Sequence, residues 1–290
     1  MPPITRLLIG TLLSVSSQMS LAETTLPDAL AVPGGIAHVL LPIKSTVDST
    51  VASTTPPTAY FETHRLLVQS TQGTPYQHQA PWLALVGIPL STEAGTQQIS
   101  VGSQSFTFEV TAKQYREQRL VIKDKRKVNP NPLDMERIGA EKTKMLGALA
   151  SWSEPKATTT LFQRPAPGPY SSPFGLRRFF NEQPRKPHSG LDIAAAKGTP
   201  ILAPAPGVVM DAGDYFFNGR NLILDHGRGL ITMYSHMERI DVKVGDQVRT
   251  GDRLGTVGSS GRVTGPHLHW TVSLNNARVD PMLFLDPQQR

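Results

Sequence analysis

The chain has 290 residues, of which 39% are hydrophobic and 18% are charged, as is ordinary for a folded protein long enough to form two domains. It contains no cysteine, so disulfides, thiolate nucleophiles and cysteine-based zinc sites are excluded. The formal net charge of +6 suits an acidic partner, but no basic face with interleaved aromatic residues indicates that this partner is nucleic acid.

The first 22 residues have the layout of a secretory signal peptide. Arg6 precedes an apolar run over residues 7–15, and a polar patch then leads to Ser20-Leu21-Ala22, with small residues at both ends of the triplet. We predict that residues 1–22 are a signal peptide cleaved after Ala22; the alternative is an uncleaved anchor or a buried strand. No other apolar run is long enough to span a bilayer, so the sequence predicts an exported protein of the periplasm or cell envelope with no transmembrane segment in the mature chain.

Residues 23–122 are predicted to form an all-β domain, a small sandwich or barrel. Polar turns rich in proline and glycine separate four runs of aliphatic, aromatic and β-branched residues, at positions 36–42, 65–69, 82–88 and 105–110. In the last run Phe106, Phe108 and Val110 share one face by strand alternation, which indicates core packing. The histidines of this half show no spacing that indicates a shared site: His38, His64 and His78.

Residues 123–168 are predicted to be a linker that contains an amphipathic helix. Asn131 is placed to cap this helix, with Pro132 at its first position and Asp134 in its first turn. The apolar residues of one helical face are Ile138, Met145, Leu146 and Leu149. The helix either docks on a neighbouring domain or serves as a plain amphipathic spacer.

Residues 169–290 read as a compact antiparallel β domain of short strands punctuated by glycine. After the Gly265-Pro266 turn a strand begins, and its period of two places His267 and His269 on the same face. Such a pair indicates a metal site, an acid–base pair or an ordinary surface strand, and alone it decides nothing.

Two further motifs in this half could complete a metal site. His188 and Asp192 lie four residues apart in a predicted loop that runs into a strand, and His236 ends an apolar strand. A catalytic zinc site uses three protein ligands and one open position. His188, Asp192 and one of the two strand histidines would satisfy this requirement, although the ligand types also allow iron or manganese.

The ordered set H-x-x-x-D, a later histidine and H-x-H resembles the lysostaphin-type (LytM-domain) zinc metallopeptidases. The resemblance covers about residues 171–285, including the segments 172–175, 207–209, 234–236, 258–261 and 265–269. It implies that His188, Asp192 and His269 bind one Zn²⁺ ion. His236 and His267 match the two catalytic histidines of the family, which assist the attacking water and the transition state; which of them is the general base is left open. His226 matches no family ligand and is interpreted as a turn residue.

The resemblance further implies an exported zinc metalloendopeptidase that hydrolyses peptide cross-links of bacterial peptidoglycan, most naturally D-alanyl–diaminopimelate links. The alternative is a non-catalytic LytM-type regulator that activates another wall hydrolase, although such relatives lack one or more ligands. A metal-binding adhesion or transport module would not need the two additional histidines.

We also expect the N-terminal half and the linker to restrain the active site, with Asn129 or Asn131 as candidates to reach the metal. The aromatic segments 177–181 and 215–219 are candidate groove walls or, equally, buried loop anchors.

Overall fold

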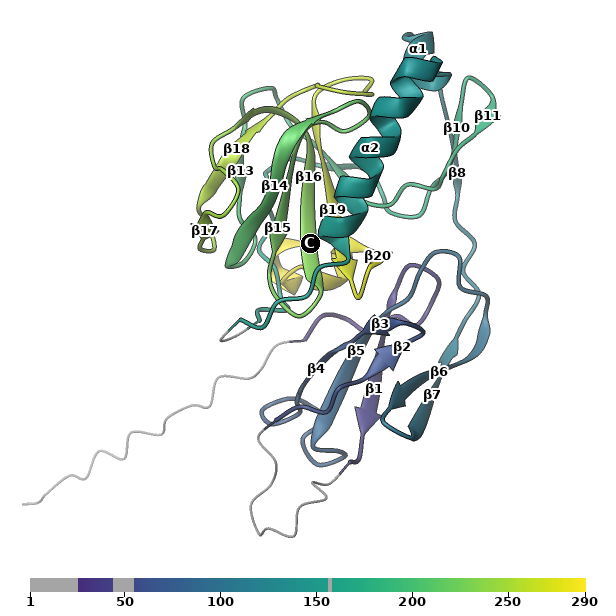
Figure 1. Ribbon diagram of the computed structural model, residues 1–290, viewed down its shortest axis with the longest axis vertical. Helices are drawn as coiled ribbons and strands as arrows, with labels where there is room; N and C mark the ends of the chain where they lie inside the picture. The colour runs from purple at the N-terminus through teal and green to yellow at the C-terminus, as the bar shows by residue number, and fades with distance from the viewer. Residues whose placement is uncertain (1–25, 44–54, 156–157) are drawn as a thin grey trace, which may run out of the picture.

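The computed structural model describes residues 26–43, 55–155 and 158–290, and the predicted signal peptide lies outside these ranges. Their fold is mainly β with two α-helices, as the sequence predicts (Figure 1). Within these ranges no helix combines the length and the apolar character needed to cross a membrane.

The N-terminal half contains two antiparallel sheets. In the first, β5 (Trp82–Gly87) lies between β1 (Ile36–Leu41) and β4 (Leu67–Ser70). The second has the order β3 (His64–Arg65), β2 (Tyr60–Phe61), β6 (Gly95–Val101) and β7 (Gln104–Val110). Phe61, Ile99 and Val110 of the second sheet pack against one face of the first, and Phe106 and Phe108 join them, so the predicted core stripe is confirmed.

Strand β5 is buried along its whole length because both of its faces are covered. One face packs against the second sheet, while Leu83 and Leu85 belong to the same apolar core as Trp270 and Leu274 of the C-terminal half. Asn275 adds two hydrogen bonds to the backbone of Gly87, at 2.7 and 3.0 Å. The two halves are therefore packed on each other through a shared core.

Between the halves the chain forms β8 (Glu117–Leu120), α1 (Lys125–Val128) and α2 (Pro132–Leu149). Helix α2 begins as predicted, because Asn131 and Asp134 cap each other's backbone N–H groups. Leu149 and Met145 pack on Ile223, Ile231 and Met233, so α2 docks on the C-terminal sheet and is not a free spacer (Figure 1). Leu146 was predicted on the packed face and lies 37% exposed, because the docked face follows Met145, Ala148 and Leu149 instead.

The C-terminal half is built on one ten-stranded sheet. Its main path has the order β17 (Gln247–Val248), β14 (Gly207–Tyr215), β15 (Gly219–Asp225), β16 (Leu230–Ile240), β19 (His267–Leu274), β12 (Leu191–Ala194) and β9 (Tyr170–Ser172). Strand β18 (Arg253–Val257) pairs with β16 and β13 (Pro200–Leu202), and β20 (Ala277–Val279) pairs with β19. Two 3₁₀ turns follow, η1 (Pro281–Phe284) and η2 (Pro287–Gln289).

A smaller sheet joins β8, which precedes the linker, to the C-terminal half. Strand β10 (Arg177–Phe180) pairs antiparallel with β11 (Gln183–Pro184) and parallel with β8, in the register Gln118 to Arg178. The end of the predicted N-terminal domain thus contributes a strand that lies beside the loop before β12.

The side chains of strand β19 alternate between the two faces of the main sheet. Leu268, Trp270, Val272 and Leu274 point into the apolar core. His267, His269 and Thr271 alternate with them and lie on the other face, the one that α2 partly covers through Ile231 and Met233 of β16.

Candidate metal centre and active site

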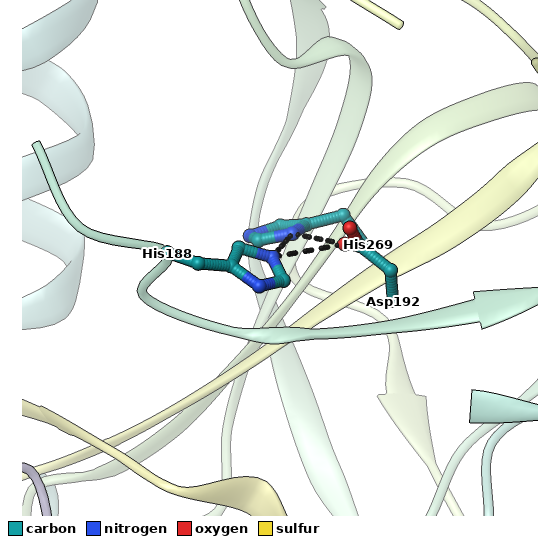
Figure 2. A group of neighbouring side chains, drawn as sticks. All are labelled: His188, Asp192 and His269. Carbon is teal, nitrogen blue, oxygen red and sulfur yellow. Dashed lines mark hydrogen bonds and ion pairs between the residues drawn. The ribbon is translucent and has the colours of Figure 1, made fainter. Parts of the chain in front are cut away.

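Strands β12 and β19 position the first two candidate ligands. Asp192 is directly opposite His269 in this antiparallel pair, so their side chains lie on the same face. His188 lies in the loop that enters β12, as predicted, and reaches the same point (Figure 2). His188 Nε2 lies 3.0 Å from Asp192 Oδ1 and 3.0 Å from His269 Nδ1, and His269 Nδ1 lies 2.8 Å from Asp192 Oδ1.

These three donor atoms fit a zinc ion. Ligand atoms about 2.0–2.1 Å from zinc at tetrahedral angles lie about 3.3–3.4 Å from one another, so a small outward movement would admit the ion. Two imidazoles and one carboxylate are the donors that zinc accepts in a cysteine-free chain. Three ligands leave one tetrahedral position open, as a catalytic site requires.

Hydrogen bonds at the far nitrogens orient both histidine ligands. His188 Nδ1 lies 2.8 Å from the carbonyl oxygen of Pro173, which can only accept, so Nδ1 carries the proton and the Nε2 lone pair faces the site. His269 is oriented the opposite way, with Nε2 at 3.1 Å from Thr271 Oγ1 and Nδ1 toward the site. In their neutral forms the two rings thus direct His188 Nε2 and His269 Nδ1 to the site.

Arg178 of β10 holds the second oxygen of the carboxylate. Its Nη2 donates to Asp192 Oδ2 at 3.0 Å, and its Nε donates to Gln118 Oε1 of β8 at 3.0 Å. Burial alone would raise the pKa of Asp192, but its close contacts with the rings of His188 and His269 hold that pKa well below its ordinary value. Asp192 is therefore an anion at neutral pH, ready to bind a cation.

His236 and His267 complete a cluster of four imidazoles. Their ring centroids are 4.9 Å apart, and the His236 ring lies 6.0 Å from that of His269. Each donates through Nδ1 to a backbone carbonyl, His236 to Ser260 at 2.9 Å and His267 to Gly265 at 2.9 Å. In the neutral ring each therefore keeps Nε2 free to accept a proton, and His267 Nε2 lies 3.8 Å from Asp192 Oδ1.

His236 reaches this cluster through an unusual backbone conformation. Ser235 pairs with His269, so in a regular strand the next side chain would point to the opposite face, into the core beside Tyr234. Instead His236 has φ of 66°, in the left-handed region that non-glycine residues rarely adopt, and its N–H donates to Asn218 O at 2.8 Å. This turn of the backbone brings the ring to the side of His267, and strain of this kind is typical of functional sites.

The cluster lies at a cavity of about 280 Å³. Besides the cluster itself, its walls come from three parts of the chain: strand β8 with Ile122 just beyond it, the β9–β10 region, and the loop before β19. Burial together with the neighbouring His267 and His269 lowers the pKa of His236 well below its ordinary value, and burial lowers that of His269 to about 4. A cavity lined by neutral imidazoles and one carboxylate can bind a metal and exchange protons with a substrate.

Comparisons with known proteins agree with this arrangement. The family described as Peptidase family M23 matches residues 186–281, and the family described as Peptidase family M23 N-terminal domain matches residues 30–113. A crystal structure from Pseudomonas aeruginosa, described as a peptidase M23, is 40% identical, with a TM-score of 0.70, and the match covers 88% of this chain and 95% of that one. The chain belongs to peptidase family M23. The predicted lysostaphin-type family and the metallopeptidase class are thereby confirmed.

Curated relatives of this M23 chain match little more than a third of it. The peptidoglycan DD-endopeptidase ShyC of Vibrio cholerae is 42% identical over 103 residues, which are 36% of this chain and 24% of ShyC. The DD-carboxypeptidase/endopeptidase Mpg of Neisseria meningitidis is 39% identical over 112 residues, 39% of this chain and 26% of Mpg. The chain thus spans about a quarter of the length of the curated relatives that it matches.

The structure of this M23 peptidase brings together all five residues singled out from the sequence, but not the other candidates. Asn131 caps α2 and Asn129 accepts from Arg185 at 3.3 Å, so neither asparagine lines the cavity. His226 lies after β15 and is fully buried, with Nδ1 donating to Pro206 O at 2.7 Å.

Of the two candidate groove walls, one lines the cavity and the other is buried. Arg178 and Phe180 of the segment 177–181 line the cavity, whereas Tyr215 and Phe216 of the segment 215–219 are buried loop anchors.

Sequence reasoning missed the residues that approach the cavity from elsewhere in the chain. They are Gln118, Leu120 and Ile122 from the β8 region and Arg262 from the loop before β19. For the β8 residues no spacing signal exists, because they lie about 70 residues before the first ligand and reach the site only through the β8–β10 pairing. Arg262 lies within the motif region of the resemblance, but a single arginine in a glycine-rich loop carries no signal of its own.

Proposed function

We propose that this M23 family member is an exported zinc metalloendopeptidase that hydrolyses peptide cross-links of bacterial peptidoglycan, of the D-alanyl–diaminopimelate type. One observation carries the proposal: three candidate ligand atoms converge on one point, and two further histidines, each with Nδ1 bonded to a backbone carbonyl, line the same cavity. The names of the relatives, a peptidoglycan DD-endopeptidase and a DD-carboxypeptidase/endopeptidase, support the choice of substrate. Export rests on residues 1–22, which lie outside the described residues.

In this proposal His188, Asp192 and His269 hold one zinc ion. Bound zinc would supply Lewis-acid polarisation of the scissile carbonyl and activation of a water. Arg178 keeps the carboxylate of Asp192 oriented through its second oxygen, and the carbonyl of Pro173 keeps His188 in the tautomer that can bind metal.

His236 and His267 provide the proton transfers. With Nδ1 donating to a backbone carbonyl, each ring can accept a proton at Nε2 from the attacking water. The imidazolium so formed can donate that proton to the leaving amine, or donate a hydrogen bond to the negative oxygen that develops on the carbonyl carbon. Two such rings 4.9 Å apart allow one to act on the water while the other acts on the oxyanion.

A regulator without activity is the weaker reading, because it has no need of His236 and His267, which line the cavity beside Asp192 and His269. An adhesion or transport module is weaker for the same reason, since it would use only the three ligands. The complete set of His188, Asp192, His236, His267 and His269 therefore favours catalysis.

We also propose that the N-terminal half restrains the enzyme, through β8 at its end. Leu120 and Ile122 narrow the cavity from one side, and β8 is held there by its pairing with β10 and by Gln118, which donates to Ser172 Oγ at 3.1 Å. A peptide cross-link that needs more room would require β8 to move. The restraint is thus a wall at the substrate groove and not a residue on the metal.

The test is digestion of purified peptidoglycan by the mature full-length protein, with the released fragments identified by mass spectrometry. Cleavage is expected to stop with a chelator, to return with zinc, and to be absent in His188→Ala. The exposed His78→Ala variant is the matched control and should retain activity. Cleavage that survives chelation, or that survives in His188→Ala, would contradict the zinc mechanism.

A further inference from the structure

Arg262 is a cation at the catalytic cavity that has no anionic partner. It lies in the loop between β18 and β19 and lines the same cavity as His236, His267 and His269. Among the described residues no carboxylate lies within ion-pair distance of its guanidinium, whereas the guanidinium of Arg178 pairs with Asp192. Asp192 is also the one acidic side chain among the described residues that line the cavity.

Two aromatic rings hold the guanidinium of Arg262 in place. Its central carbon lies 4.2 Å from the ring centroid of Phe217 and 4.8 Å from that of Phe180. One N–H group donates to the carbonyl oxygen of Lys127 at 3.3 Å. A guanidinium has five N–H donors, so most of its hydrogen-bonding capacity remains for another group. The rings fix the plane of the cation without neutralising it.

The surroundings favour an anion at this point. Burial, together with the positive charges of Arg178 and Arg185, lowers the pKa of Arg262 to about 10, so the side chain is still charged at neutral pH. A half-buried cation among other cations is costly unless an anion joins it. A carboxylate matches the planar fork of arginine, since it can accept two parallel hydrogen bonds.

We propose that Arg262 binds a free carboxylate of the peptide substrate beside the scissile bond, and that it thereby selects the substrate. This inference rests on the proposed function and deepens it. In a D-alanyl–diaminopimelate link, the carbon attached to the scissile nitrogen also carries a free carboxylate. A bridge built of glycine, or a diaminopimelate with that carboxyl amidated, lacks this anion. Arg262 is then a specificity residue and takes no part in proton transfer.

The experiment compares two synthetic cross-linked peptides that differ only at this group, a free carboxylate in one and a primary amide in the other. The zinc-loaded full-length protein should cleave the acid with a kcat/KM about 10- to 100-fold higher than that of the amide. Arg262→Gln should lower the rate on the acid to that of the amide and leave the amide rate unchanged. Arg262→Lys should retain part of the preference.

Arg185→Gln is the matched control, because it removes a neighbouring positive charge that does not line the cavity. Its ratio of acid to amide should stay within about threefold of the wild-type ratio. Equal cleavage of both peptides by the wild type would overturn the inference, as would an equal loss on both in Arg262→Gln. A collapse of the ratio in Arg185→Gln would also overturn it, because general charge would then be the cause.

A binding measurement separates this inference from the proposed function. In full-length His188→Ala, calorimetric titration should show the acid peptide binding at least about tenfold more tightly than the amide, and adding Arg262→Gln should abolish the difference. If the wild type cleaves neither peptide but this difference is found, the peptidase proposal fails and the carboxylate site stands. If no difference is found, the carboxylate site is refuted whether or not cleavage occurs.

Discussion

Replacing Gly190 with alanine should damage the metal centre without touching a ligand. Gly190 lies between His188 and Asp192, where the backbone passes close to β19. A Cβ atom at this position would lie 2.6 Å from the carbonyl oxygen of Trp270, 2.7 Å from Cε1 of His269 and 2.8 Å from its Nε2. The φ of Gly190 lies outside the left-handed region, so its backbone conformation does not require glycine. Glycine is needed at this position because of the close approach.

The size of the effect follows from which atoms must move. The contact to Trp270 is with backbone, so it must open from 2.6 Å to at least 3.0 Å by separating β12 from β19. Those strands carry Asp192 and His269, whose donor atoms are 2.8 Å apart. Overpacking of this kind costs about 1–3 kcal/mol of folding free energy. Disturbing the ring of a ligand by this amount should weaken zinc binding about 10- to 100-fold, as is typical when the support of a metal ligand is lost.

Two measurements check this prediction. Competition with a chromophoric chelator gives the zinc dissociation constant, and urea denaturation of the metal-free protein gives the free energy of unfolding. Gly265→Ala is the matched control, because it is also at the cavity but its added Cβ meets no atom within 4 Å. If Gly190→Ala bound zinc and unfolded as the wild type does, the packing argument for the centre would be refuted.

Three further outcomes are expected. Alanine at His236 or His267 should lower kcat by about 10²- to 10⁴-fold while one zinc ion per chain remains bound; loss of zinc in either variant would make that residue a ligand. Burial lowers the pKa of His226 to about 4 from its ordinary 6.5, so the folded state binds fewer protons between these values. About 3 kcal/mol of the free energy of unfolding should therefore be lost as the pH falls from 6.5 to 4. In urea titrations His226→Gln should reduce this dependence of stability on pH, and an unchanged dependence would contradict the assignment of the loss to His226. Cysteines in place of the facing residues Arg119 and Phe179 should form a disulfide that locks β8 to β10, and wall digestion should then be at least about tenfold slower than in the reduced form. Equal digestion rates of the oxidised and reduced forms, with single-cysteine variants insensitive to oxidant, would refute the restraint by β8.

Local spacing in the sequence indicated two pairs of neighbouring side chains, and only the resemblance to a known family joined them with His236 into one zinc site. A strand period of two places His267 and His269 on one face, and the loop before β12 is short enough that His188 and Asp192 must be neighbours. The start of α2 was predictable for a similar reason, since Asn131, Pro132 and Asp134 act within a single turn. Local chemistry of this kind needs no knowledge of the tertiary fold.

The remaining features depend on tertiary contacts. Simple alternation would direct His236 into the core, and only the left-handed backbone at this residue brings it into the site. Gln118 reaches the cavity because β8 pairs with β10 across a sequence gap of about 60 residues. Arg262 is held at the cavity by the rings of Phe180 and Phe217, and no spacing in the sequence predicts that these two rings meet it.

The division of the chain into residues 23–122, 123–168 and 169–290 stays a prediction. Pairing of β8 with β10 and the shared core of Leu83, Leu85 and Trp270 tie these segments together. Their folding in isolation would have to be measured.

The most direct test of the metal centre is an anomalous diffraction map of crystals grown with one equivalent of zinc. We predict a single strong peak about 2.0–2.2 Å from His188 Nε2, His269 Nδ1 and Asp192 Oδ1, with His236 and His267 beyond bonding distance. A peak bound by His236 or His267, or no peak at these three atoms, would contradict the assignment.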